Sequence, residues 1–127
     1  MTAPRDQDRD EQGLGASAVL DDLFDVIEAR RRDRPAGSYV VTLLDGGWEA
    51  IAAKIREEAD EICEAGAEQS DAAVAHEAAD LVFHLLVGLA ARGVEPAAVY
   101  AELARRFGIG GLDEKASRAK RDGDTEA

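Results

Sequence analysis

Two pairs of carboxylates, each with a spacing of three residues, are the side chains of this sequence best suited to chemistry. Glu58 and Glu61 form one pair, and Glu77 and Asp80 form the other. Residues three apart on a helix are neighbours, so the two carboxylates of each pair repel each other unless something compensates their charge. Mg²⁺ is the simplest compensator, because it prefers oxygen ligands and commonly brings substrate phosphates with it. The spacing therefore predicts a helical, Mg²⁺-dependent enzyme that acts on a phosphate compound.

The first pair lies within a helix that we predict over about 48–67. An apolar stripe on this helix is made by Ile51, Ile55 and Ile62. At roughly 100° per residue, Glu58 falls about 40° from the centre of the stripe, whereas Glu57 points more towards water. A glutamate in an apolar stripe is costly to bury without a partner. Glu58 is thus the strongest local anomaly in the sequence.

The second pair lies within a helix predicted over about 72–92 and ended by Gly93, a typical residue after a helix. From residue 78 to residue 91 only Asp80 and His84 are polar. A helix that is apolar nearly all round is either central or lies at a subunit interface. For His84, which shares a face with the acids, a packed side chain is favoured over one that faces the substrate.

If these two helices pack antiparallel, the four carboxylates can face one another and hold one or two Mg²⁺ ions. Such ions bridge phosphate oxygens and acidify a water, which is what hydrolysis of a diphosphate bond requires. The competing interpretation is a set of solvated acids on ordinary helix faces. A di-iron carboxylate bundle is a further alternative, but it uses Glu-x-x-His on two helices, and neither pair has histidine at that position.

The remaining elements supply the scaffold around this hairpin. A helix is expected from Ser17, fraying in the basic run 30–34 before Pro35. The segment 38–45 is interpreted as a loop or short helical turn, because an isolated strand has no partner. Asp45-Gly46-Gly47 offers an N-cap to the next helix, and another helix is predicted over about 96–107. We predict one domain over 17–109, a disordered tail over 1–16 and a flexible charged tail over 110–127.

Composition agrees with a single helical domain. The chain has 127 residues, of which 46% are hydrophobic and only 5% aromatic, a balance that favours helix packing over a β-sandwich. The formal net charge of −12 disfavours nucleic acid and anionic membranes as partners. The charged N-terminus lacks the apolar core of a secretory signal, and the apolar stretch 81–91 is too short to cross a bilayer. A cytoplasmic protein is expected, with its single cysteine, Cys63, packed inside.

The strings KIREEADEI and HEAADLVFHLLVGLAARGV resemble phosphoribosyl-ATP pyrophosphohydrolases, within the superfamily of all-α nucleotide pyrophosphohydrolases that includes the MazG-type enzymes. The EExxE and ExxD signature of that superfamily is matched at five positions, namely Glu57, Glu58, Glu61, Glu77 and Asp80. The narrower likeness rests on GSY, LLDGG, FHLLV and GLDEKASR, and the resemblance covers about residues 20–118. One departure is Val40, where members of the family often have threonine.

The resemblance implies an all-α, four-helix-bundle-like fold completed by homodimerisation. It implies hydrolysis of phosphoribosyl-ATP to phosphoribosyl-AMP and pyrophosphate, the second step of histidine biosynthesis, with Mg²⁺ or, as a substitute, Mn²⁺. The implied catalytic residues and metal ligands are Glu58, Glu61, Glu77 and Asp80, with Glu57 as an additional acid near the metal. Lys54 and His84 are the predicted nucleotide contacts, and the basic run before Pro35 is a further candidate for phosphate binding.

Two alternatives differ in class from this expectation. A MazG-type house-cleaning hydrolase of nucleoside triphosphates would share the metal site and differ in base recognition. A non-enzymatic acidic helical interaction module would show no Mg²⁺ dependence and would tolerate Glu58→Gln.

Overall fold

The computed structural model describes residues 16–108, and every regular element in that range is helical. The helices are α2 (Ala16–Asp33), α3 (Tyr39–Asp45), α4 (Gly47–Glu68), α5 (Asp71–Arg92) and α6 (Pro96–Gly108). The all-α prediction is confirmed. The described residues fall into two compact units, 16–94 and 95–108, and the second consists essentially of α6. The predicted tails lie outside the described residues, except that Ala16 already begins α2.

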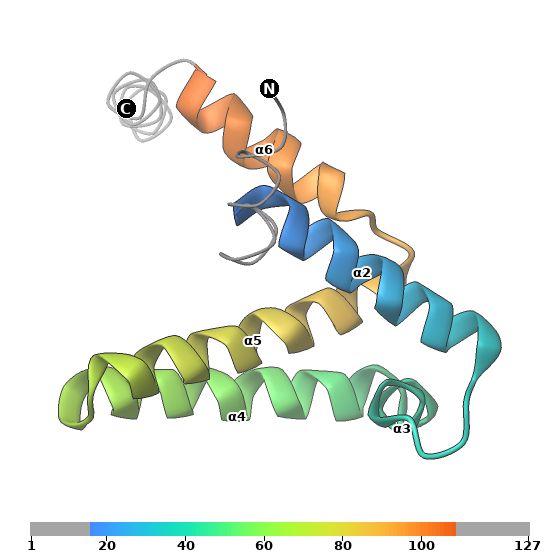
Figure 1. The fold of residues 1–127 in the computed structure, drawn as a ribbon, viewed down its shortest axis with the longest axis horizontal. Coiled ribbons are helices and arrows are strands. Elements are labelled where there is room, and N and C mark those ends of the chain that lie inside the picture. Colours follow the sequence, from blue (N-terminus) through green and yellow to red (C-terminus); the bar gives the residue numbers. More distant parts are fainter. Residues whose placement is uncertain (1–15, 109–127) are drawn as a thin grey trace, which may run out of the picture. The chain divides into compact units, whose positions relative to one another are not determined.

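Helices α4 and α5 form a long antiparallel hairpin, the largest packing contact of the first unit (Figure 1). Its turn is closed by Ser70, whose hydroxyl accepts a hydrogen bond of 3.2 Å from the amide of Ala73 at the start of α5. At the other end Gly93 adopts a left-handed conformation with φ of 70°, and its amide donates to the carbonyl of Ala90. The two helices predicted to carry the acids are therefore confirmed to within about one residue at each end.

The hydrophobic core lies at one end of this hairpin. It joins α2 and α3 to the first half of α4 and the second half of α5, and its buried members are Phe24, Ile27, Val40, Leu43, Ile51, Leu86, Val87 and Ala90. Figure 1 shows the other half of the hairpin extending away from α2 and α3. Between residues 59 and 83 only Ala65 is buried. The carboxylate pairs belong to this half, outside the main core.

Segment 38–45 contains the short helix α3, in agreement with the predicted helical turn. The hydroxyl of Ser38 caps it by accepting a hydrogen bond of 3.3 Å from the amide of Val41. The N-cap of α4 lies within the predicted segment 45–47, at Gly46, which has no side chain to offer a hydrogen bond. Asp45 instead ends α3, and its carboxylate accepts a hydrogen bond from the guanidinium of Arg34.

Two other expectations are corrected. The basic run does not fray, since α2 remains helical through Asp33. Basic side chains near a helix C-terminus suit its dipole, which explains why the helix continues. Cys63 is exposed rather than packed, because it lies in the part of α4 beyond the main core.

Helix α5 is long and apolar enough to cross a membrane by length and composition alone, with a mean hydropathy of 1.4 over its most apolar window. Core helices of globular proteins pass the same test. Here α5 packs along the whole of α4 and contributes Leu86, Val87 and Ala90 to the core. Only 22% of that window is buried in the single chain, so the core accounts for part of the apolar character of α5 and leaves Val82 and Leu85 exposed.

Candidate active site

Three carboxylates from the two arms of the hairpin converge where the core ends. Glu58 and Glu61 of α4 and Glu77 of α5 each offer an oxygen, and these atoms all lie within 4.8 Å of one another. Glu58 is only 6% exposed. One oxygen of Glu58 and one of Glu77, the Oε2 atom in each case, are buried without a hydrogen-bond partner. Such an arrangement is unfavourable unless a cation occupies it, because buried charged acceptors need compensation.

Burial raises the pKa of the Glu58 carboxyl above its ordinary value of 4.5. Hydrogen bonding to Glu61 and the charge of that neighbour raise the pKa further, Asp80 adds to the effect, and Lys54 opposes it. The dominant cause is thus the apolar environment that the sequence predicted for this glutamate. A divalent cation at the cluster would reverse the balance by favouring the charged carboxylate.

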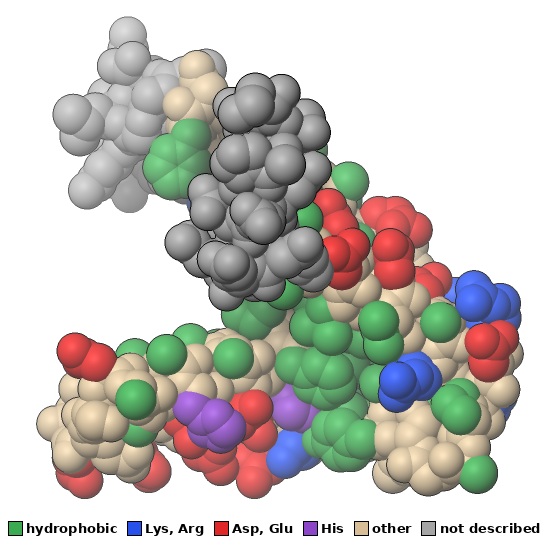
Figure 2. All heavy atoms as spheres, viewed as in Figure 1, with side chains coloured by type: hydrophobic (Ala, Val, Ile, Leu, Met, Phe, Trp, Pro, Cys, Tyr) green, Lys and Arg blue, Asp and Glu red, His purple; other side chains and the backbone are tan. Residues whose placement is uncertain are grey.

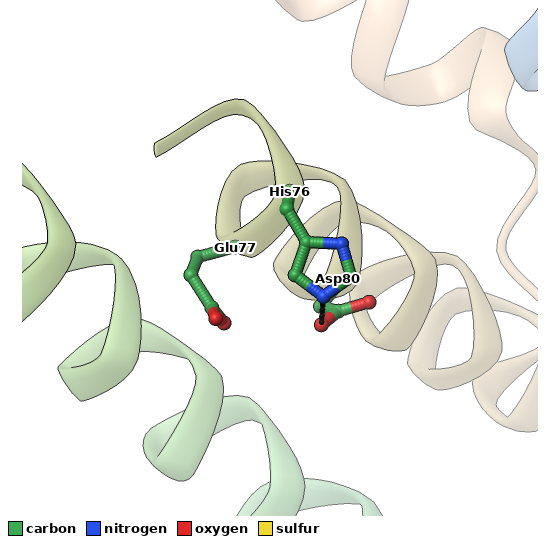
Figure 3. A group of neighbouring side chains, drawn as sticks. All are labelled: His76, Glu77 and Asp80. Carbon is green, nitrogen blue, oxygen red and sulfur yellow. Dashed lines mark ion pairs between the residues drawn. The ribbon is translucent and has the colours of Figure 1, made fainter. Parts of the chain in front are cut away.

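A second group of potential ligands adjoins the first and shares Glu77 with it. His76, Glu77 and Asp80 also offer ligand atoms within 4.8 Å of one another. The imidazole Nε2 of His76 lies 3.4 Å from a carboxylate oxygen of Asp80 (Figure 3). Figure 3 shows Glu77 turned towards α4, while His76 and Asp80 lie together on α5. Glu77 therefore stands between two sets of ligands and is placed to bridge them.

His76 was not among the residues singled out in the sequence. The sequence feature that could have identified His76 is its position four residues before Asp80, because this spacing puts the two side chains on one helix face. Asp80 was expected to join the other three acids directly, but the structure places it in the group with His76. It remains close enough to raise the pKa of Glu58. On the face shown in Figure 2, acidic and histidine side chains gather over the middle of the α4–α5 hairpin.

Lys54 and Glu57 lie at the edge of the cluster. The ammonium of Lys54 is 3.0 Å from a carboxylate oxygen of Glu57 and 3.5 Å from one of Glu58. Its pKa is raised, chiefly by the hydrogen bond to Glu57. Glu57 is exposed and belongs to neither ligand group, as its outward orientation on the predicted helix indicated. Lys54 thus places one positive charge beside the buried Glu58.

His84 is buried and both of its ring nitrogens are engaged. Its Nδ1 lies 2.7 Å from the carbonyl oxygen of Asp80, and its Nε2 lies 2.8 Å from the hydroxyl of Tyr39. Because a carbonyl can only accept, Nδ1 is the donor, and Nε2 accepts from Tyr39 in the neutral ring. Tyr39 also stacks on Phe83. The structure therefore agrees with the packed interpretation, and a direct contact between His84 and a nucleotide stays a prediction.

The donor set fits a hard divalent cation. Mg²⁺ prefers oxygen ligands and is commonly held by a few carboxylates together with water and substrate phosphates. Glu58, Glu61 and Glu77 provide such a set from two rigid helices, with two buried oxygens otherwise unpartnered. The adjoining group, which includes an imidazole, also suits Mn²⁺.

Comparison with known proteins gives a consistent result. The profile of the family described as phosphoribosyl-ATP pyrophosphohydrolase matches residues 20–107. A protein of Rhodopirellula baltica named phosphoribosyl-ATP pyrophosphatase is 51% identical over 110 residues, covering 84% of this chain and 92% of the relative. One of the same name from Trichlorobacter lovleyi is 45% identical, covering 79% of this chain and 93% of the relative.

A third relative, from Helicobacter hepaticus, is named histidine biosynthesis bifunctional protein HisIE. It is 45% identical over 105 residues, which are 83% of this chain and 46% of that longer protein. The family profile covers α3, α4 and α5 completely, and with them all the ligand groups described above. Carboxylates of the EExxE and ExxD signature converge from both arms of the hairpin. The chain belongs to the phosphoribosyl-ATP pyrophosphohydrolase family.

Proposed function

We propose that this protein hydrolyses phosphoribosyl-ATP to phosphoribosyl-AMP and pyrophosphate, a step of histidine biosynthesis. The structural observation that carries the proposal is the convergence of Glu58, Glu61 and Glu77 around two buried, unpartnered oxygens. The names and high identity of the relatives supply the substrate. Family membership narrows the chemistry that such a cluster can support to the hydrolysis of a phosphoanhydride.

Glu58, Glu61 and Glu77 would hold Mg²⁺, and Asp80 with His76 would complete an adjoining position that shares Glu77. When bound, the ion neutralises charge on the diphosphate and makes a coordinated water more acidic. Mn²⁺ is expected to substitute, since its preference for oxygen ligands overlaps that of Mg²⁺. A carboxylate oxygen of the cluster that does not contact the ion would take the proton of the attacking water.

The protein residues around the cluster position the substrate and the ligands. Lys54 supplies a positive charge 3.5 Å from a carboxylate oxygen of Glu58, so it would contact a phosphate of a substrate bound at the cluster. His84 and Tyr39 pack against each other on the core side of Asp80, and His84 holds the backbone carbonyl of that residue. This contact makes His84 a positioning residue for Asp80 in the proposed mechanism.

We further propose that the active protein is a homodimer in the cytoplasm. The half of the hairpin that bears the acids has one buried residue between positions 59 and 83. On α5 the side chains of Val82 and Leu85 are 36% and 44% exposed in the single chain. A second copy packed along this half would cover these side chains and exclude water from the site. Light scattering should then give twice the chain mass of 13.5 kDa.

Substrate choice is the test of the proposed reaction. Pyrophosphate release is measured with Mg²⁺ on phosphoribosyl-ATP, on ATP and on a panel of deoxynucleoside triphosphates. We expect the highest kcat/KM on phosphoribosyl-ATP. A preference for deoxynucleotides would assign the chain to the house-cleaning activity of the MazG-type enzymes instead, and absence of turnover on every nucleotide would favour an interaction module.

A further inference from the structure

A pocket of about 270 Å³ lies at the core end of the α4–α5 hairpin, away from the carboxylates. It is formed where α2 ends, α4 begins and α5 ends. Three arginines line it, namely Arg31, Arg34 and Arg92, and its lining includes no acidic residue. In a chain of net charge −12 this concentration of positive charge is exceptional. The apolar part of the wall includes Leu44, Trp48 and Ile51.

The arginines keep donors available for a ligand. Arg31 binds Glu28 at 2.9 Å, and Arg34 binds Asp45, but both are exposed pairs within reach of water. Such pairs contribute little to stability, and each guanidinium has five N–H donors, so a pair occupies only some of them. Among the described residues, Arg92 makes no ion pair. The pocket can therefore accept a further anion without breaking the fold.

The start of α4 adds to the positive potential. Gly47, the first residue of this 22-residue helix, lines the pocket, and Gly46 before it has no side chain to cap the free amides. The N-terminus of a helix carries partial positive charge and exposes N–H groups that suit phosphate. Guanidinium groups bind phosphate oxygens in a bidentate manner. The anion that fits this combination best is a phosphate monoester.

Trp48 indicates what the phosphate is attached to. This residue is 51% exposed and lines the same pocket as the arginines. Large, half-exposed aromatic side chains are suited to packing against a sugar or a base. The volume is below the usual range for pockets that enclose a whole drug-sized ligand, so it suits one phosphorylated moiety.

The pocket is separate from the carboxylate cluster. Trp48 and Glu58 are ten residues apart on α4, which corresponds to about 15 Å along the helix axis. Arg92 and Asp80 are twelve residues apart on α5, or about 18 Å. Ile51, which is fully buried, lies between Trp48 and Glu58 along α4. None of the residues that line the pocket belongs to either ligand group.

We propose that Arg31, Arg34 and Arg92, together with Trp48, form a binding site for the phosphate monoester of a ribosyl compound. Two sources have this chemistry. One is the phosphoribosyl end of the substrate, which is remote from the bond that is hydrolysed; this source rests on the proposed function. The other is a free nucleoside monophosphate that binds independently of turnover.

The test uses the fluorescence of Trp48, which is the single tryptophan of the chain and lies in the pocket wall. Ribose 5-phosphate and AMP are titrated into the full-length protein in the presence of EDTA. We expect a saturable change in emission with at least one of them. Arg92→Ala should weaken the binding about tenfold, the loss expected for one charge-assisted contact. Arg31→Ala is the second variant, in case Arg92→Ala unfolds.

Arg32→Ala is the matched control, because Arg32 belongs to the same basic run, pairs only with Asp33 and does not line the pocket. It should bind as the wild type does, and so should Glu58→Gln. The proposal is overturned if neither compound gives a saturable response, or if both arginine variants bind as tightly as Arg32→Ala. Inorganic phosphate that binds as tightly as both ribosyl compounds would overturn the assignment to a ribosyl ligand.

Turnover then distinguishes the two sources. If the substrate occupies the pocket, Arg92→Ala raises KM for phosphoribosyl-ATP about tenfold with kcat nearly unchanged. If a free nucleotide occupies it, KM stays at the wild-type value while AMP binding is lost. A wild-type protein that binds AMP but does not hydrolyse phosphoribosyl-ATP would contradict the proposed function and leave the pocket assignment standing.

Discussion

Glu58 on α4 and Glu77 on α5 each bury a carboxylate oxygen that has no hydrogen-bond partner, in a cluster whose ligand atoms lie within 4.8 Å of one another. Two helices that pack this closely could bury apolar side chains at these positions at no electrostatic cost. The cluster instead concentrates negative charge that destabilises the metal-free protein. This is the relationship expected of a site whose stability depends on a bound cation.

The first prediction concerns stability and pH in the metal-free protein. The folded state raises the pKa of Glu58 above its ordinary value of 4.5, chiefly by burial, so it holds the proton more tightly than the unfolded chain does. The contribution of Glu58 to the stability of the folded state is therefore most favourable below the pKa that this carboxyl has in the unfolded chain. It is lost as the pH rises through the pKa that the carboxyl has in the folded state. Glu58→Gln should stabilise the protein by about 1 kcal/mol at neutral pH in EDTA.

Thermal unfolding at several pH values measures this effect. The difference between Glu58→Gln and wild type should shrink as the pH falls below the unfolded pKa, where the carboxyl is protonated in both states. Glu57→Gln is the control, because Glu57 is exposed and outside both ligand groups. A Glu58→Gln variant that is less stable than wild type at neutral pH would show that the charge is compensated within the protein.

The second prediction concerns the gain in stability from a cation. A ligand present at about 100 times its Kd stabilises the folded state by about 2.7 kcal/mol, which for a chain of this size raises Tm on the order of 10 °C. We expect Mg²⁺ to produce such a shift in wild type and in Glu57→Gln. Glu77→Gln should lose most of it, because Glu77 belongs to both ligand groups. If Mg²⁺ raised Tm equally in all three proteins, the cation would bind at a site other than this cluster.

The third prediction separates the two ligand groups by metal preference. His76 belongs only to the group with Asp80, and an imidazole suits Mn²⁺ better than Mg²⁺. His76→Ala should therefore weaken Mn²⁺ binding several-fold more than Mg²⁺ binding, as measured by isothermal titration calorimetry. If His76→Ala weakens the binding of both ions equally, His76 does not coordinate the metal and is only a surface partner of Asp80.

The fourth prediction concerns the packed histidine. Tyr39→Phe removes the hydroxyl that lies 2.8 Å from Nε2 of His84 and leaves that buried nitrogen without its partner. The ring itself, with its stacking on Phe83, is kept. The free energy of unfolding should fall by about 1–2 kcal/mol in urea denaturation. A change below about 0.3 kcal/mol would mean that water replaces the hydroxyl.

Helical periodicity was sufficient to predict the hairpin and the burial of Glu58, because both depend on residues close together in the sequence. The residue that caps α4 within 45–47 was less predictable, since the Asp45 carboxylate binds Arg34, eleven residues away, and Gly46 occupies the capping position. His76 was overlooked because it lies outside the ExxD spacing. The basic run 30–34 was predicted as a candidate for phosphate binding, but its position beside Arg92 could not be predicted, because tertiary packing brings Arg31 and Arg92 together.

The most direct test of the proposed function is pyrophosphate release from phosphoribosyl-ATP as a function of Mg²⁺ concentration, in wild type, Glu58→Gln, Asp80→Asn and Glu57→Gln. We predict Mg²⁺-dependent turnover in wild type and, somewhat reduced at most, in Glu57→Gln. Glu58→Gln and Asp80→Asn should lose at least a factor of about 100 in kcat while remaining folded, as one lost electrostatic contact to the transition state commonly costs. Turnover by Glu58→Gln at the wild-type rate, or turnover that persists in EDTA, would contradict the proposed role of the carboxylate cluster.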